Sequence, residues 1–182
     1  MKRVFIIHGW EADPESNWFP WLKKELEKKG FAAVVPAMPN SAHPDCAEWV
    51  AYLKKIVGRV DKDTFFIGHS LGAITILNYL NDLAAGEKVG KAILISGSNK
   101  NPGFPKLASF FSVPMDIAKI RQTSDSFTVI HSDDDPVVPI EMGKEMSDAL
   151  QAEFITVHEG GHLNTGNGFF EFPLVLEKIL EQ

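Results

Sequence analysis

The chain has 182 residues, of which 45% are hydrophobic and 23% charged, a composition typical of one globular domain. Its net charge of −6, without a basic stripe, argues against a nucleic-acid-binding surface. Cys46 is the only cysteine, so an intrachain disulfide is excluded and a reducing compartment is expected. The N-terminal apolar run, Val4–Ile7, is too short for a signal peptide or a membrane span. We expect a single cytoplasmic domain over residues 1–182 with no membrane partner.

Apolar, β-prone runs alternate along the chain with helical patterns. In chain order the expected elements are a strand at Val4–His8, a helix at Glu15–Lys29, a strand at Ala32–Pro36, a helix at Asp45–Val57, a strand at Thr64–Gly68, a helix at Ser70–Leu83, strands at Lys91–Ser96 and Phe127–His131, a helix at Ile140–Gln151, a strand at Phe154–His158 and a helix at Phe170–Leu180. The strand interiors are continuously apolar, as in a parallel sheet buried on both faces. The pattern predicts an α/β fold with a six-stranded, mostly parallel sheet and helices on both faces.

Residues 97–126 interrupt this alternation, because prolines and asparagines are mixed there with Phe104, Phe110, Phe111 and Met115. One interpretation is a loop with a short helix that packs onto its own domain. The other is a small lid or pocket wall beside a functional site. The two interpretations are compatible.

The third predicted strand leads into Gly68-His69-Ser70-Leu71-Gly72, a G-x-S-x-G sequence followed by a helical pattern. This strand-turn-helix context is that of a nucleophile elbow, where a serine hydroxyl is exposed above the sheet. Gly68 and Gly72 suit a turn too tight for side chains. We therefore expect Ser70 to be a nucleophile.

Polar residues that suit an acyl-transfer site follow the last two predicted strands. Asp133, Asp134 and Asp135 come after one strand, and His162 follows the other on a Gly-Gly loop. Ligands of open α/β sheets bind beyond the carboxyl ends of the strands, where Ser70 is also expected. Serine, acid and histidine in this order are typical of α/β-hydrolases. Asp135 precedes Pro136, which favours an extended backbone in a loop.

His162 is favoured as the base over the other five histidines. His69 adjoins the nucleophile, and His43 lies in a Pro-rich loop. The other three end predicted strands: His8, His131 and His158. Residues 158–162 also spell H-E-x-x-H, a zinc-protease signature that requires a helix. A β-prone run and two adjacent glycines argue against a helix there, so we expect no metal and no cofactor. The oxyanion hole is expected at the backbone N–H groups of Leu71 and Trp10.

The chain resembles the small serine hydrolases of the retinoblastoma-binding-protein-9 type and their bacterial relatives. The resemblance rests on Ile6-Ile7-His8-Gly9, Asn17-Trp18-Phe19-Pro20-Trp21-Leu22, Met38-Pro39, the Ser70 elbow, Asp134-Asp135-Pro136 and Gly161-His162. It implies an α/β-hydrolase core with no large cap domain and a triad of Ser70, Asp135 and His162. Residues 58–62, Gly-Arg-Val-Asp-Lys, lack the L-x-C-x-E motif that binds the retinoblastoma protein, so no such partner is inferred.

Together these observations predict a metal-independent serine hydrolase that cleaves small carboxylic esters through an acyl-enzyme. Its pocket is expected to be shallow and wet, with Trp10, Phe110 and Phe111 as apolar walls and Trp18 either a wall or a core residue. The same triad would serve a peptidase or amidase. A non-catalytic binding protein on a hydrolase fold is the alternative from another class.

Overall fold

The computed structural model describes residues 1–181. Its elements are β1 (Arg3–Ile7), α1 (Phe19–Lys28), β2 (Ala32–Val34), α2 (Cys46–Val57), β3 (Thr64–His69), α3 (Leu71–Asn81), β4 (Val89–Ile95), η1 (Pro105–Leu107), α4 (Ala108–Phe111), α5 (Ile117–Gln122), β5 (Ser124–Ser132), α6 (Ile140–Leu150), β6 (Glu153–Val157), η2 (Thr165–Asn167) and α7 (Pro173–Leu180). The strands form one sheet in the order β2-β1-β3-β4-β5-β6. Every pairing is parallel, so the predicted six-stranded α/β sheet is confirmed.

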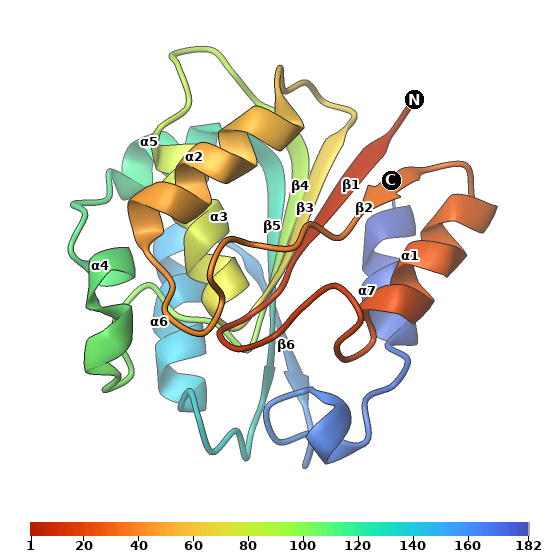
Figure 1. Ribbon diagram of the computed structural model, residues 1–182, viewed down its shortest axis with the longest axis vertical. Coiled ribbons are helices and arrows are strands. Elements are labelled where there is room, and N and C mark those ends of the chain that lie inside the picture. Colours follow the sequence, from red (N-terminus) through yellow and green to blue (C-terminus); the bar gives the residue numbers. More distant parts are fainter. Residues whose placement is uncertain (182) are drawn as a thin grey trace.

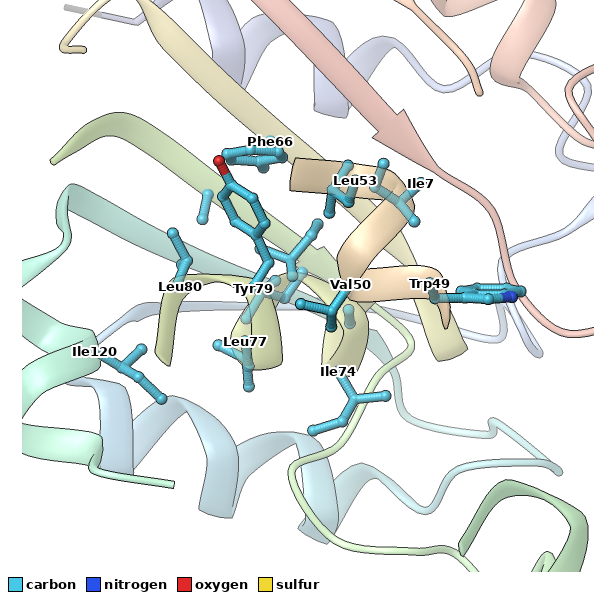
Figure 2. Close-up of a cluster of buried hydrophobic side chains, with 14 of the residues drawn as sticks. Ile7, Trp49, Val50, Leu53, Phe66, Ile74, Leu77, Tyr79, Leu80 and Ile120 are labelled. Atoms are coloured by element: carbon cyan, nitrogen blue, oxygen red, sulfur yellow. The ribbon is translucent and has the colours of Figure 1, made fainter. Parts of the chain in front are cut away.

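Helices cover both faces of the sheet (Figure 1). Helices α1 and α7 lie on one face, and α2 to α6 lie on the other. Successive residues of a strand point to opposite faces. Val4 and Ile6 of β1 accordingly join the core under α1 and α7, whereas Phe5 and Ile7 join the core under α2 and α3. This second core contains Trp49, Phe66 and Tyr79 (Figure 2).

Two helices begin later than the sequence patterns predict. Helix α1 starts at Phe19 rather than Glu15, and α7 starts at Pro173 rather than Phe170. Each has a proline in its first turn, where the missing N–H has no intrahelical partner to lose. Before α1, Asp13 Oδ1 accepts hydrogen bonds from Glu15 N and Ser16 Oγ, so residues 13–16 form a turn.

Residues 97–126 contain two short α-helices where one was expected, together with η1 and the start of β5. Phe110 of α4 is buried, and its ring lies 5.5 Å from that of Trp49 in an edge-to-face arrangement. Asp116 caps the N-terminus of helix α5, because its side chain accepts a hydrogen bond from Lys119 N, and the helix buries Ile120. The segment therefore packs onto the face that carries α2 and α3. Among residues 1–181, no helix combines the length and apolar character needed to span a bilayer.

Candidate active site

Ser70 lies on a strained turn between β3 and α3. Its backbone angles are φ 54° and ψ −118°, and residues with side chains rarely adopt a positive φ. A Cβ added at Gly72 would lie 2.1 Å from the Ile7 carbonyl oxygen, and one at Gly68 would lie 2.7 Å from Ala73 N. Only glycine fits at these two positions. The close packing of Gly72 against β1 and of Gly68 against the start of α3 thus gives the physical reason for the G-x-S-x-G sequence.

His162 and Asp135 are buried and hydrogen-bonded to each other. The Nδ1 atom of His162 lies 2.9 Å from Asp135 Oδ2 and 3.0 Å from Oδ1. An ionised carboxylate only accepts hydrogen bonds, so Nδ1 carries the proton and Nε2 is left free to accept one. Asp135 Oδ1 also accepts hydrogen bonds from the backbone N–H groups of Val137 and Val138, at 2.8 and 3.0 Å.

These hydrogen bonds keep Asp135 ionised despite its burial. Burial alone raises the pKa of this carboxyl group. The hydrogen bond and charge of His162, with the amides of Val138 and Val137, outweigh that effect and hold the pKa below its ordinary value. The carboxylate is therefore available to accept the Nδ1–H of His162.

Ser70 and His162 line the same cavity, at the carboxyl edge of the sheet. The hydrogen bonds of the described residues do not include one between Ser70 Oγ and His162 Nε2. Such catalytic hydrogen bonds are often long before substrate binds and tighten in the Michaelis complex. The structure therefore brings the three sequence-predicted residues to one place, with the His162–Asp135 pair already formed.

The two neighbouring acids have other partners. Asp133 is bonded to the exposed ring of His158, at 2.6 Å, and to Glu159 N. Asp134 accepts hydrogen bonds from Ser132 Oγ and Gly161 N and so braces the loop before His162. The H-E-x-x-H stretch follows β6 as a turn, and its two histidines are in different surroundings: His158 is exposed and His162 is buried.

Three further histidines are buried and form hydrogen bonds with backbone groups near the site. His69 Nε2–H donates to the His162 carbonyl oxygen at 2.9 Å, and burial lowers the pKa of His69 to about 3. His8 accepts a hydrogen bond from Met38 N at Nε2 and donates from Nδ1 to the Gly9 carbonyl. His131 donates from Nε2 to Val138 O in the loop of Asp135. Burial also lowers the pKa of His8 and of His131.

The loop of His162 is held by Asn17, Trp18 and Asn167, of which sequence reasoning considers only Trp18, as either a pocket wall or a core residue. The indole N–H of Trp18, which is fully buried, donates to the Leu163 carbonyl at 3.0 Å. Asn17 Oδ1 accepts from both the N–H and the hydroxyl of Thr165, and Asn167 Oδ1 accepts from His162 N. Trp18 is thus a core residue. The Asn-Trp pair was visible in the sequence, but nothing there indicated that it contacts a loop about 145 residues away.

Trp10 and Leu71, whose backbone N–H groups are the expected oxyanion donors, line a cavity together with Ser70. Leu71 follows the serine as the first residue of α3, where N–H groups lack intrahelical partners. Gly9 passes close to the serine, because a Cβ added there would lie 3.1 Å from Ser70 Cβ. Within the described chain neither N–H is bonded to a backbone acceptor. The position suits two donors for an oxyanion.

Two cavities meet at Ser70. The first, of about 270 Å³, is mostly apolar, with Leu71, Ile74, Phe104, Leu107, Phe111 and Val138 among its walls. The second, of about 550 Å³, is more polar and contains His162. Trp10 lines both. Phe111 lines the apolar cavity, but Phe110 does not: its side chain is fully buried against Trp49, so the structure places Phe110 in the core and not in the predicted pocket wall.

The apolar cavity also differs from the shallow, wet pocket that the sequence predicts. Residues 97–111 supply Pro102, Phe104, Leu107 and Phe111 to its wall, so this segment is a pocket wall as well as a packed part of the core. Without a large cap, one apolar side of the site is nonetheless covered by the connection between β4 and α4.

The parallel sheet and the serine turn define a serine hydrolase of the α/β-hydrolase superfamily. A model of the serine hydrolase family matches residues 4–181, and the chain belongs to this family. It is similar to the YdeN protein of Bacillus subtilis (strain 168), with 34% identity over 98% of this chain and 94% of the relative. The crystal structure of the B. subtilis ydeN gene product matches with a TM-score of 0.94 over 98% of this chain and 97% of that one.

More distant relatives are consistent with this assignment. The serine hydrolase RBBP9 of Rattus norvegicus is 28% identical over 98% of this chain and 95% of its own length. The resemblance drawn from the sequence motifs is therefore confirmed. Est1E from Butyrivibrio proteoclasticus, solved with ferulic acid bound, shares the fold with a TM-score of 0.76 and 15% identity, over 98% of this chain and 86% of that one.

Proposed function

We propose that the protein hydrolyses carboxylic esters through an acyl-enzyme, with Ser70 as nucleophile, His162 as general base and acid, and Asp135 as the residue that orients His162. The observation that carries the proposal is the His162–Asp135 pair beside the strained Ser70 turn. Asp135 fixes the tautomer that leaves Nε2 of His162 available to the serine hydroxyl.

In the first half of the reaction, Ser70 Oγ attacks the ester carbonyl carbon and its proton passes to His162 Nε2. The carbonyl oxygen becomes an oxyanion, and the N–H groups of Trp10 and Leu71 stabilise it. The intermediate then collapses, and the bond to the alcohol oxygen breaks. The alcohol leaves with the proton from His162, and the acyl group remains on Ser70.

In the second half, a water molecule attacks the acyl carbon and gives its proton to His162 Nε2. The second tetrahedral intermediate breaks its bond to Ser70 Oγ, which regains the proton. A carboxylic acid is released. Each of the two oxyanion donors is expected to contribute about 10²–10³-fold to kcat, as in other enzymes of this mechanism.

The test is the hydrolysis of p-nitrophenyl butyrate by the wild-type protein and three variants. We expect Ser70→Ala to abolish turnover and Asp135→Asn to lower kcat by about 10³–10⁴-fold, because the amide favours the wrong tautomer of His162. Asp133→Asn is the matched control, since Asp133 is exposed and bonded to His158. Equal activity of Asp135→Asn and Asp133→Asn would overturn the assignment of the acid.

A further inference from the structure

The two cavities at Ser70 differ in one chemically decisive residue. His162 lines the polar cavity and is not among the residues that line the apolar one. In the proposed reaction His162 must hand its proton to the departing alcohol oxygen, so the alcohol has to lie on the side of His162. The acyl chain then occupies the apolar cavity. The positions of the two groups follow from the direction of this proton transfer.

The alcohol side of the site is acidic. Glu11 and Glu15 line the polar cavity, and no lysine or arginine is among its lining residues. Neither carboxylate forms a salt bridge within residues 1–181. Two uncompensated carboxylates in a concave surface attract cations and repel anions.

Aromatic rings border the same cavity. Phe170 lines it with 66% of its surface exposed, which is unusual for a large apolar side chain in this protein. Trp10 lines it too, but Lys106 Nζ already lies 5.8 Å from the centre of the Trp10 ring, so Phe170 is the aromatic residue on which a cation–π contact with the substrate rests. Aromatic faces together with carboxylates are the features that bind alkylammonium groups, through cation–π attraction and charge. A cationic alcohol thus suits both chemical features of the cavity.

The acyl side is small and apolar. Its volume of about 270 Å³ lies just below the range of roughly 300–1,000 Å³ that is common for drug-sized ligands. Apart from Ser70 and Ser98, its lining residues are apolar. A short apolar acyl chain fills this space, whereas an acyl chain that ends in a carboxylate would leave a charge without a partner.

We infer that the substrates are esters of short apolar carboxylic acids with small alcohols that carry an ammonium group. The inference rests on the proposed ester hydrolysis and adds the chemical identity of both halves of the substrate.

The test compares esters that differ in one feature at a time. Butyrylcholine and 3,3-dimethylbutyl butyrate share the acyl group and the shape of the alcohol but differ in its charge. We expect kcat/KM to be about tenfold higher for the choline ester at low salt and the preference to fall as salt rises, because the carboxylates are exposed. Succinylmonocholine has the same alcohol and an anionic acyl chain, and it should be hydrolysed at least about tenfold more slowly than butyrylcholine.

Substitutions in the polar cavity test whether its residues cause the preference for the choline ester. Glu11→Gln combined with Glu15→Gln, or Phe170→Leu, should bring the ratio of the two butyrate esters toward one. The control Glu177→Gln changes an exposed carboxylate on α7 and should leave the ratio as it is. A ratio near or below one in the wild type, with both butyrates hydrolysed, would overturn the inference and leave the proposed function standing. If neither these esters nor p-nitrophenyl butyrate were hydrolysed, the proposed function itself would be wrong.

Discussion

Lowering the pH from 8 to 5 should destabilise the protein through His69. The ring is buried, and its Nε2–H donates to the His162 carbonyl. Burial lowers the pKa of His69 to about 3, whereas the unfolded chain has the ordinary value of about 6.5. At pH 8, well above 6.5, the ring is neutral in both states. As the pH falls below 6.5 the unfolded chain takes up the proton and the folded one does not, so stability is lost.

The size of this effect follows from the two pKa values. At pH 5 the unfolded state gains RT ln(1 + 10^1.5) from protonation of His69, which is about 2 kcal/mol. Any folded pKa below about 4 gives nearly the same result at this pH. The buried His8 and His131 shift in the same direction and add to the loss, whereas the exposed His158, whose pKa is raised by Asp133, acts in the opposite direction.

The assay is urea denaturation at pH 8 and pH 5 for the wild type and for His69→Gln. Glutamine can donate a hydrogen bond to the same carbonyl but does not titrate, so the variant should lose about 2 kcal/mol less than the wild type over this interval. The comparison uses the change with pH, so a general destabilisation by the substitution does not affect it. An equal loss in both proteins would refute the view that His69 is held neutral by the fold.

Three further predictions concern packing around the site. Gly72→Ala should reduce the free energy of unfolding by about 3 kcal/mol or more, because its Cβ would meet the Ile7 carbonyl. As a control, Gly166→Ala on the exposed 3₁₀ turn should unfold at nearly the wild-type urea concentration. Phe110→Ala should reduce the free energy of unfolding by about 3–5 kcal/mol, because the side chain is fully buried. Phe111→Ala should reduce it by less and instead change KM for esters with longer acyl chains, because Phe111 lines the apolar cavity. Similar losses of stability in the two variants would contradict the different burial of the two side chains. Trp18→Phe should reduce the free energy of unfolding by about 1–3 kcal/mol and lower kcat, because the Leu163 carbonyl next to His162 loses its hydrogen-bond donor. An unchanged kcat would show that the position of His162 does not depend on this hydrogen bond.

The sheet was predictable because its signal is local. Each strand is a short apolar run, and each run leads into a turn at the same edge of the sheet. The elbow was equally readable, since Gly68 and Gly72 have a steric role that no other residue fills. The starts of α1 and α7 were predicted too early, although Pro20 and Pro173 lie in the first turns of the two helices.

The parts that could not be predicted depend on contacts distant in sequence. Phe110 and Phe111 are adjacent on a one-turn helix, and it is the contact of Phe110 with distant core residues such as Trp49 that distinguishes them. Three consecutive aspartates follow β5, and the geometry of their loop decides that Asp135 meets His162 while Asp133 meets His158. The bond from Trp18 to Leu163 joins the two ends of the chain and has no local signature.

The central claim is that Ser70 is an activated nucleophile. Its most direct test is intact-mass spectrometry after treatment with a fluorophosphonate, for the wild type and for Ser70→Ala. We expect the folded wild type to gain one phosphonyl group, mapped by peptide analysis to Ser70, and Ser70→Ala to gain none. A folded wild-type protein that remains unmodified, or modification that persists in Ser70→Ala, would contradict the account.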